Sequence, residues 1–276
     1  MPELPEVETI RRGLARQVVG WRVRRVAIHE RRLRFPVSRR LAARVTGCRI
    51  LAAERRAKYL ILPLDSGDRL LIHLGMSGRL SVLPWPQPPG RHDHVDFELA
   101  DADDQRSLLR FRDPRRFGAV LLWPATQPHH ALLAALGPEP FDPAFDADYL
   151  FARARGRRLA VKNFIMDGRI VVGVGNIYAS EALFRAGLRP TRPAGRVTRA
   201  EFARLAAHIR EVLRDAIAQG GTTLRDFADA KGAVGYFRVR LDAYGRDGQP
   251  CRICGTEIRR VRVGQRSSFY CPHCQR

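Results

Sequence analysis

Apolar residues near the start of the chain recur at intervals of three and four. An α-helix turns once every 3.6 residues, so residues at this spacing share one face of a helix. The residues concerned are Val7, Ile10, Leu14 and Val18. Pro5 suits the first turn, because the N–H that proline lacks would have no partner there, and Gly20 can end the helix. The pattern therefore predicts an amphipathic helix close to the N-terminus.

After Gly20 the pattern becomes strand-like, in short runs of apolar and polar residues. The predicted strands are Val23–His29, Arg49–Arg55, Tyr59–Leu64, Arg69–Leu74, Arg79–Leu83, Val95–Leu99, Ser107–Phe111 and Ala119–Trp123. Turn residues separate most of them, for example at 65–68 and 84–90. Because no helical segment intervenes, this half of the chain predicts an antiparallel β-sandwich flanked by the N-terminal helix.

A proline-rich segment at 137–143 marks a linker, and a period of 3.6 follows it. The predicted helices are Asp148–Arg155, Leu159–Met166, Ile177–Arg185 and Arg199–Ala218. The last of them opens with Thr198 and Glu201 at the spacing of a capping box and closes at Gly220-Gly221. A helical domain is therefore expected after the sandwich.

Four cysteines near the C-terminus form two Cys-x-x-Cys pairs. They are Cys251, Cys254, Cys271 and Cys274. This spacing is typical of a zinc ribbon, in which four thiolates hold one structural Zn2+. Residues 259–276 contain five arginines and no acid, so the ribbon would be a rigid cationic hairpin suited to a DNA groove. The expected fold is an α+β multidomain chain with domains at 1–136, 137–235 and 236–276.

The chain of 276 residues has 49 Lys and Arg against 28 Asp and Glu, a net charge of +21. A charge this large favours polyanions, and guanidinium matches phosphate well, so nucleic acid is the expected partner. No apolar run approaches the roughly 20 residues of a membrane span, and the acidic N-terminus does not resemble a signal peptide. The cysteine usage suits a reducing cytoplasm, and the solitary Cys48 is expected to be buried on a strand.

The first residues offer a candidate nucleophile. Removal of Met1 would leave Pro2 with a free secondary amine. An α-amino group has a pKa of roughly 8, against about 10 for lysine, so part of it is uncharged at neutral pH. Such an amine can attack an electrophilic carbon and hold it as an iminium, and Glu3 could move the protons. The alternative is a disordered terminus with a chance Pro-Glu pair.

Eight motifs in order along the chain decide between these alternatives, because they resemble those of formamidopyrimidine-DNA glycosylases, the bacterial 8-oxoguanine repair family. They are PELPEVET at 2–9, RRAKYL at 55–60, HLGMSG at 73–78, HDHVD at 92–96, DPRRFGA at 113–119, VGVGNIYASEALF at 172–184, GGTTLRDF at 220–227 and GQRSSFYC at 264–271. The resemblance implies an N-terminal β-sandwich, a helix–two-turns–helix domain and a zinc finger. It implies a bifunctional glycosylase and AP lyase that removes 8-oxoguanine and formamidopyrimidines from double-stranded DNA. We also expect a monomer in the bacterial cytoplasm, associated with the nucleoid.

The resemblance also implies catalytic roles. Pro2 would attack C1′ of a nucleotide flipped out of the duplex, Glu3 would act as general acid toward the sugar, and Glu6 would support the site. Lys58 would assist β-elimination. Arg266 would assist δ-elimination, although a guanidinium is too basic to be an easy acid and is better suited to clamp a phosphate.

Further residues match the family's DNA contacts. Met76, Arg115 and Phe117 match a triad that fills the vacated stack, in which Arg115 bonds the orphaned cytosine. On sequence alone, Met76 and Phe117 would more often be core residues, and Arg115 and Arg116 a solvated pair. The other implied contacts are His92, Arg116, Arg157, Lys162 and Asn176. Asn176 opens a predicted helix, which is a natural anion site, and Thr222 and Thr223 belong to a loop that would cover the flipped purine.

Two alternatives stay open on the sequence. An endonuclease VIII-like glycosylase for oxidised pyrimidines shares the architecture, but PELPEVET and GGTTLRDF favour the purine enzyme. A non-catalytic zinc-containing DNA-binding protein explains the charge and the ribbon but not Pro2-Glu3. The chain departs from the family in having Asn163-Phe164 where Pro-Trp is frequent, and the sequence does not explain the prolines at 84–90.

Overall fold

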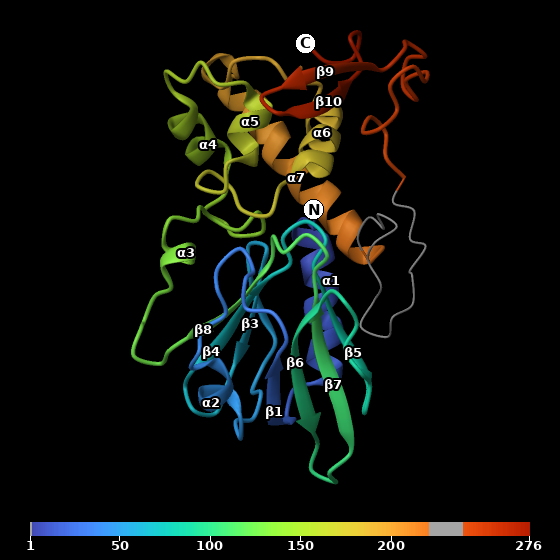
Figure 1. The fold of residues 1–276 in the computed structure, drawn as a ribbon. Helices are drawn as coiled ribbons and strands as arrows, with labels where there is room; N and C mark the ends of the chain where they lie inside the picture. Colours follow the sequence, from blue (N-terminus) through green and yellow to red (C-terminus); the bar gives the residue numbers. More distant parts are fainter. Residues whose placement is uncertain (1, 221–239) are drawn as a thin grey trace. The chain divides into compact units, whose positions relative to one another are not determined.

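The computed structural model describes residues 2–220 and 240–276. They form two compact units, one of residues 2–134 and the other of residues 135–219 together with 240–276. Figure 1 shows the fold of each unit. The domain limits 1–136, 137–235 and 236–276 stay predictions, and the limit at 235/236 lies outside the described residues.

Helix α1 (Leu4–Gln17) opens the first unit, with Glu3 as its N-cap residue. The periodic apolar residues predicted for this helix are all buried, including Val18 just past its end. The helix ends three residues before Gly20, which turns the chain at a φ of +89°. The predicted N-terminal helix is therefore confirmed, with an earlier end.

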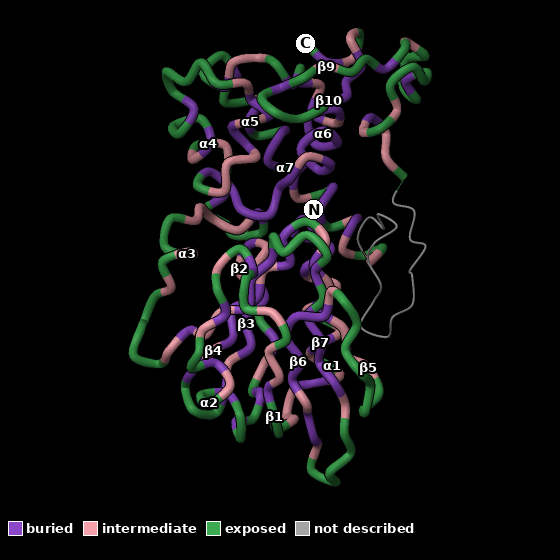
Figure 2. The backbone as a smooth tube through the Cα atoms, in the orientation of Figure 1, coloured by how far each residue is buried: buried purple, intermediate pink, exposed green. Residues whose placement is uncertain are grey.

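Two four-stranded antiparallel sheets form the rest of this unit. One has the order β1-β6-β7-β5, and its strands are β1 (Arg22–Ile28), β6 (Asp93–Ala100), β7 (Arg106–Arg112) and β5 (Arg79–Pro84). The other has the order β2-β3-β4-β8, and its strands are β2 (Glu54–Arg56), β3 (Tyr59–Pro63), β4 (Arg69–His73) and β8 (Ala119–Trp123). Buried residues run along the middles of β3, β4 and β6 (Figure 2), and α1 packs in the same core. The antiparallel sandwich is confirmed.

The strand predicted at Arg49–Arg55 is wrong in its middle. Arg49 makes an isolated bridge to Arg22 of one sheet, and Ile50 makes another to Leu64 beside the other sheet. The chain thus crosses between the sheets here, and it joins a ladder again only at β2. Cys48 is buried as expected, but it lies before this crossing and on no strand.

Two short helices of this unit were not predicted. Helix α2 (Leu41–Val45) buries only its first and last residues, and α3 (Ala131–Ala134) buries none. A helix this short completes too few turns to show a period of 3.6 in the sequence. Their absence from the prediction follows from their length.

The second unit contains the predicted helices. They are α4 (Ala147–Ala154), α5 (Val161–Met166), α6 (Asn176–Arg185) and α7 (Arg199–Ala218), with a 3-10 turn, η1, at Ala194–Arg196. The capping box of Thr198 and Glu201 is present at the start of α7. Helix α5 begins two residues later than predicted, because Ala160 before it has an extended backbone.

The C-terminal finger of this unit is a hairpin of β9 (Arg259–Val263) and β10 (Arg266–Tyr270), with Gly264 and Gln265 as its turn. Its core is small and includes Ile258, Phe269 and two of the cysteines, packed against Phe184 of α6. The buried Glu181 of α6 accepts hydrogen bonds from the backbone N–H groups of 242–244, at 2.7–2.9 Å. The finger is thus attached to the helices by polar as well as apolar contacts.

Candidate functional site

The N-terminal residues lie at the start of α1 and are not a loose tail. Pro2 is buried, and Glu3 and Glu6 are only 3% and 7% exposed. The backbone N–H of Glu3 donates to Oε2 of Glu6 at 2.8 Å. Glu6 therefore fixes the backbone that follows Pro2. This hydrogen bond is one way in which Glu6 could support the site, as predicted.

Lys58 lies in the tight turn between β2 and β3. Arg56 and Tyr59 pair across this turn, which leaves Ala57 and Lys58 at its tip. Ala57 has a φ of +55°, a left-handed conformation that suits two-residue hairpin turns. The turn thus projects Lys58 from one end of the sheet.

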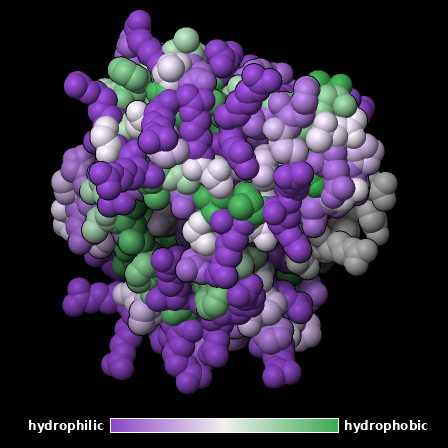
Figure 3. Space-filling view, turned by 90° about the horizontal axis from the view of Figure 1, so that it is seen from above, coloured by the Kyte–Doolittle hydropathy of each residue, from purple (hydrophilic) through white to green (hydrophobic). Residues whose placement is uncertain are grey.

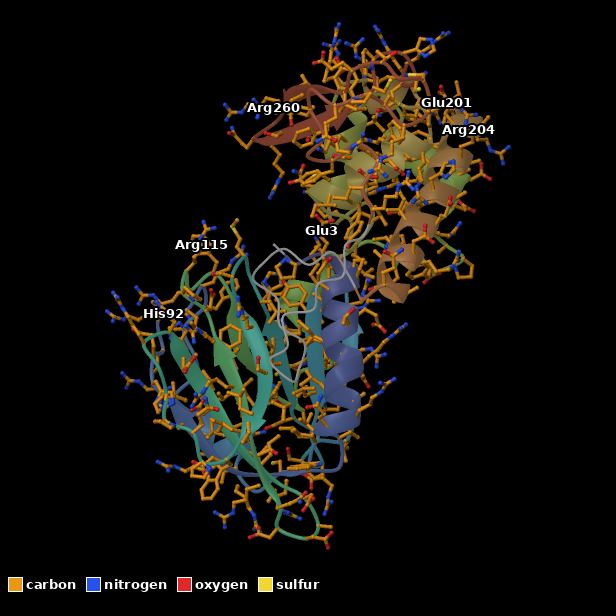
Figure 4. All side chains as sticks on the ribbon, turned by 90° about the vertical axis from the view of Figure 1, so that its right-hand side faces the viewer. Glu3, His92, Arg115, Glu201, Arg204 and Arg260 are labelled. Atoms are coloured by element: carbon orange, nitrogen blue, oxygen red, sulfur yellow. The ribbon has the colours of Figure 1, made fainter. Side chains whose placement is uncertain are left out.

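Strand register brings further motifs to the same end. Tyr59 pairs with His73 at the end of β4, and His73 pairs with Ala119 at the start of β8. The turn at 57–58, the loop at 74–78 and the loop at 113–118 therefore leave the sheet side by side. Figure 4 shows Glu3 and Arg115 toward this end of the unit.

His73 is the first residue of the HLGMSG motif, and the sequence predicted no role for it. Its Nδ1 accepts the backbone N–H of Gly75 at 3.1 Å, and its ring lies against that of Tyr59. Burial lowers the pKa of His73 to about 4, and the charges of Arg34 and Lys58 act in the same direction. With Nδ1 occupied, a neutral His73 presents an Nε2–H donor. This neutral form of His73 follows from its contacts with Gly75 and Tyr59, which the sequence does not show.

The loops that carry the predicted void-filling triad are tied together by Asp113, which is fully buried. Its carboxylate accepts from Ser77 Oγ at 2.5 Å and from the backbone N–H of Gly118 at 2.8 Å. The backbones also touch, since a Cβ on Gly75 would lie 2.4 Å from the carbonyl carbon of Phe117. One buried carboxylate therefore holds both loops in a fixed relation.

The triad itself lies on the surface of these loops. Met76 is 40% and Phe117 45% exposed, so neither is a core residue. The guanidinium of Arg115 stacks over the Phe117 ring at 4.7 Å. Exposed apolar and aromatic side chains beside a cation are suited to contact bases.

His92 lies beside the same loop, because its carbonyl accepts the backbone N–H of Asp113 at 3.0 Å. The proline-rich segment before it is held by Arg110, which is buried. Arg110 donates to Asp96 at 2.8 Å and to the carbonyls of Gln87 and Pro88 at 2.9 and 3.1 Å. The segment at 84–90 thus folds back on β6 and β7 and leads the chain to His92.

Arg116 is also near His92. It has a φ of +56° and forms an ion pair with Glu30 at 3.2 Å. Both Arg116 and His92 line a pocket of about 470 Å³, together with His29 and His94. The carboxylates of Glu30 and Asp93 line the same pocket, so it carries charges of both signs.

The DNA contacts predicted in the second unit have different surroundings. Arg157 is exposed, and so is Arg266 at the start of β10. Asn176 is the first residue of α6, and no donor in the described residues reaches its buried Oδ1. Amide oxygen and nitrogen exchange by a flip, so Asn176 can offer a donor at that position.

Lys162 is buried in this structure. It is 1% exposed, and its Nζ donates to Ser268 Oγ at 2.7 Å and to the carbonyl of Ser267 at 3.2 Å. These groups belong to β10, so the ammonium connects α5 to the hairpin. In this conformation Lys162 is an internal donor, because a buried ammonium needs polar partners, and its contact with a phosphate stays a prediction.

The four cysteines converge as predicted. Their Sγ atoms all lie within 4.8 Å of one another. Three of the separations are 3.4, 3.5 and 3.9 Å, close to the roughly 3.8 Å expected between sulfurs of a tetrahedral Zn–S4 centre. The donor set fits zinc, and a closed set of four leaves no open position for catalysis. Thr222 and Thr223 lie outside the described residues.

Comparison with known proteins agrees with this geometry along the whole chain. The family models for the formamidopyrimidine-DNA glycosylase N-terminal domain, its H2TH domain, and the zinc finger found in FPG and IleRS match residues 1–120, 136–228 and 248–276. The chain belongs to this family. The zinc finger model also supports the assignment of one structural zinc to the four cysteines.

Individual relatives span the full length. The formamidopyrimidine-DNA glycosylases of Syntrophotalea carbinolica and Methylococcus capsulatus are 58% and 56% identical, each over all of both chains. A complex between the Lactococcus lactis Fpg and DNA containing an abasic site is similar in structure, with a TM-score of 0.90 and 32% identity over 99% of both chains. The MutM (Fpg) protein of Thermus thermophilus has a TM-score of 0.86 and 39% identity, over 99% of this chain and 98% of that one.

The surface accords with a nucleic-acid partner. Hydrophilic side chains project over most of the face seen in Figure 3, as the net charge of +21 requires. Among the described helices, none is long and apolar enough to cross a membrane.

Proposed function

We propose that this chain is a DNA glycosylase with AP lyase activity that removes 8-oxoguanine and formamidopyrimidines from double-stranded DNA. The observation that carries the proposal is the start of α1, where Pro2 and the N-cap residue Glu3 are buried directly before the helix instead of trailing in solvent. A nucleophile must be held within reach of its target, and a fixed position lowers the entropy cost of the attack. Family membership over the full length supports the same activity.

The proposed reaction begins with a nucleotide flipped out of the duplex, because a stacked base cannot be reached. The amine of Pro2 attacks C1′ and the damaged base leaves, while Glu3 protonates the sugar ring oxygen as the ring opens. The resulting iminium acidifies the C2′ hydrogens, so the 3′ phosphate is eliminated, with Lys58 assisting. Arg266 would clamp the phosphate that leaves in the second, δ-elimination.

The vacated stack is proposed to be filled by Met76 and Phe117, with Arg115 bonding the orphaned cytosine. Their exposure and their attachment to one buried carboxylate support this role. His92, Arg116, Arg157 and Asn176 are proposed to contact the DNA backbone. We further propose that the protein acts as a monomer in the bacterial cytoplasm, on DNA of the nucleoid.

Base preference tests the proposal. Duplexes with 8-oxoguanine and with thymine glycol, each opposite cytosine or adenine, are compared for base release under single-turnover conditions. We expect 8-oxoguanine opposite cytosine to be excised fastest. A strong preference for thymine glycol would instead assign the chain to the oxidised-pyrimidine branch, and binding without base release would leave a non-catalytic DNA-binding protein.

A further inference from the structure

Glu8 lies one turn into α1, and its role is not explained by the chemistry above. Its side chain is 12% exposed and accepts hydrogen bonds from three arginines. Arg11 donates at 2.8 Å, Arg12 at 2.9 Å and Arg55 at 3.2 Å. Burial raises the pKa of Glu8, but the hydrogen bonds of Arg11 and Arg12 and the charges of Arg11 and Arg55 outweigh it, so the pKa lies below its usual value. Glu8 is therefore a carboxylate at neutral pH.

Arg55 uses its guanidinium in two directions. Its Nε donates to Glu8 Oε2 at 3.2 Å, and its Nη1 donates to the carbonyl oxygen of Ala57 at 2.9 Å. Its side chain is also only 12% exposed. The planar fork of a guanidinium holds both acceptors in a fixed geometry, which the single ammonium of lysine cannot reproduce. Arg55 thus connects α1 to the tip of the β2–β3 turn.

The carbonyl that Arg55 holds belongs to the peptide bond between Ala57 and Lys58. Because a peptide unit is planar, fixing its oxygen fixes the direction in which the chain enters Lys58. Ala57 is in the left-handed region, where a non-glycine residue needs support from its surroundings. Arg11 adds a second connection, from α1 to the carbonyl of Ala53 at 3.1 Å. Strand β2, which leads into the turn, is thus attached to the helix at two points, at Arg55 and at Ala53 just before the strand.

We propose that the Glu8–Arg55 pair has a positioning role: it fixes the turn that carries Lys58 against helix α1, which Pro2 and Glu3 directly precede. Glu8 is four residues along α1 from Leu4, which is about 6 Å of helix. Helix α1 is fixed independently by its apolar face in the core. Loss of the pair therefore moves the turn and leaves Pro2 and Glu3 in place. The inference rests on the proposed function, because it takes Lys58 as the group that assists β-elimination.

The test separates strand scission from base release. Glu8→Gln keeps the shape of the side chain without its charge, and Arg55→Lys keeps the charge without the fork. Each variant is assayed in single turnover on a duplex with an abasic site, for scission, and on a duplex with 8-oxoguanine, for base release. We expect scission to slow by about tenfold, as misplacement of a catalytic group does, while base release and the Kd for DNA change by less than about twofold.

Arg12→Gln is the matched control. Arg12 contacts the same carboxylate, but its side chain is 53% exposed, and among the described residues its hydrogen bond goes to Glu8 and not to the turn. We expect this variant to retain both rates. Thermal unfolding of all three variants accompanies the assays, so that a loss of fold is measured directly.

Lys58→Ala is the reference variant. It distinguishes a failure of the proposed function from a failure of the positioning role. If Lys58→Ala leaves scission unchanged, the proposed role of Lys58 is wrong, and the inference falls with it. If Lys58→Ala slows scission but Glu8→Gln and Arg55→Lys do not, the positioning role alone is overturned. If scission and base release fall in parallel and the Tm is lower, the pair is a general structural contact, and the positioning role is overturned as well.

Discussion

The β-sandwich of the first unit and the finger of the second hold their functional side chains by different means. In the sandwich a large apolar core fixes α1 and the strands, the buried carboxylate of Asp113 fixes two loops, and the part-buried carboxylate of Glu8 is proposed to fix the β2–β3 turn. The finger has only a small core, to which two of its four cysteines belong. A hairpin this small cannot bury enough apolar surface to be stable by itself. In the finger a metal therefore replaces the core, and cationic side chains can remain exposed.

The largest effect expected from this difference follows zinc removal. Chelation, or Cys254→Ser, should release the β9–β10 hairpin and lower the affinity for lesion-containing duplex on the order of a hundredfold, because we expect the arginines of this hairpin to bind phosphates. Hydrogen exchange measures the structural part. Amides of β9 and β10 should lose protection, while those of β3, β4, β6 and β7 keep it.

Ser107→Ala, a change on the inner strand β7 of the sandwich and outside the finger, serves as the control. It should leave both zinc content and DNA affinity unaltered. Unfolding of the sandwich together with the finger in one transition would contradict the division into a core-stabilised and a metal-stabilised region.

A smaller effect is expected at Lys162, the buried ammonium between α5 and β10. Lys162→Met keeps the apolar stem but leaves Ser268 Oγ and the Ser267 carbonyl without this donor, which should cost about 1–3 kcal/mol of stability in the finger. Hydrogen exchange of the β10 amides measures it. The dependence of log Kd on log salt should stay unchanged, because a buried group neutralises no phosphate.

Arg260→Gln is the comparison for that salt dependence. Arg260 is exposed on β9 (Figure 4), so its loss should reduce the salt slope by up to about one if it contacts a phosphate. A reduced slope in Lys162→Met would restore the phosphate-binding role that the motif implied and would show that the ammonium leaves the finger when DNA binds.

The smallest effect concerns His73, whose pKa is lowered to about 4, first by burial and then by the charges of Arg34 and Lys58. The unfolded chain takes up this proton at about pH 6.5, so the neutral ring contributes stability above that pH. The contribution is lost as the pH falls from 6.5 toward 4. NMR titration of the ring should give a midpoint near 4 in the wild type and a higher one in Lys58→Met. A midpoint near 6.5 in the wild type would contradict the environment described.

The sequence predicted the elements whose pattern is local. The period of three and four gave α1, the alternation gave most strands, and the spacing of the cysteines gave the metal site. It missed what depends on contacts distant in sequence. The crossing at 51–53 depends on bridges from Arg49 and Ile50 to separate sheets, and the burial of Lys162 depends on β10, about a hundred residues later.

The candidate site shows the same limit. The motifs identified Pro2, Glu3 and Lys58 as candidate reacting groups. They do not show which residues hold these groups in position. Asp113 unites two loops only because β4 and β8 are neighbours in the sheet. Arg55 connects helix and turn only because α1 packs beside β2. The contacts that hold the reacting groups depend on strand register and on packing, which the sequence does not show.

In the proposed mechanism, the amine of Pro2 forms the covalent bond to the sugar. The direct measurement is borohydride reduction of the complex with an 8-oxoguanine duplex, followed by mass analysis of the N-terminal peptide. We predict a DNA remnant on Pro2, in a chain from which Met1 has been removed, and a much weaker adduct in Pro2→Gly. An undiminished adduct after the terminal amine is blocked, or full activity with Met1 retained, would contradict the mechanism.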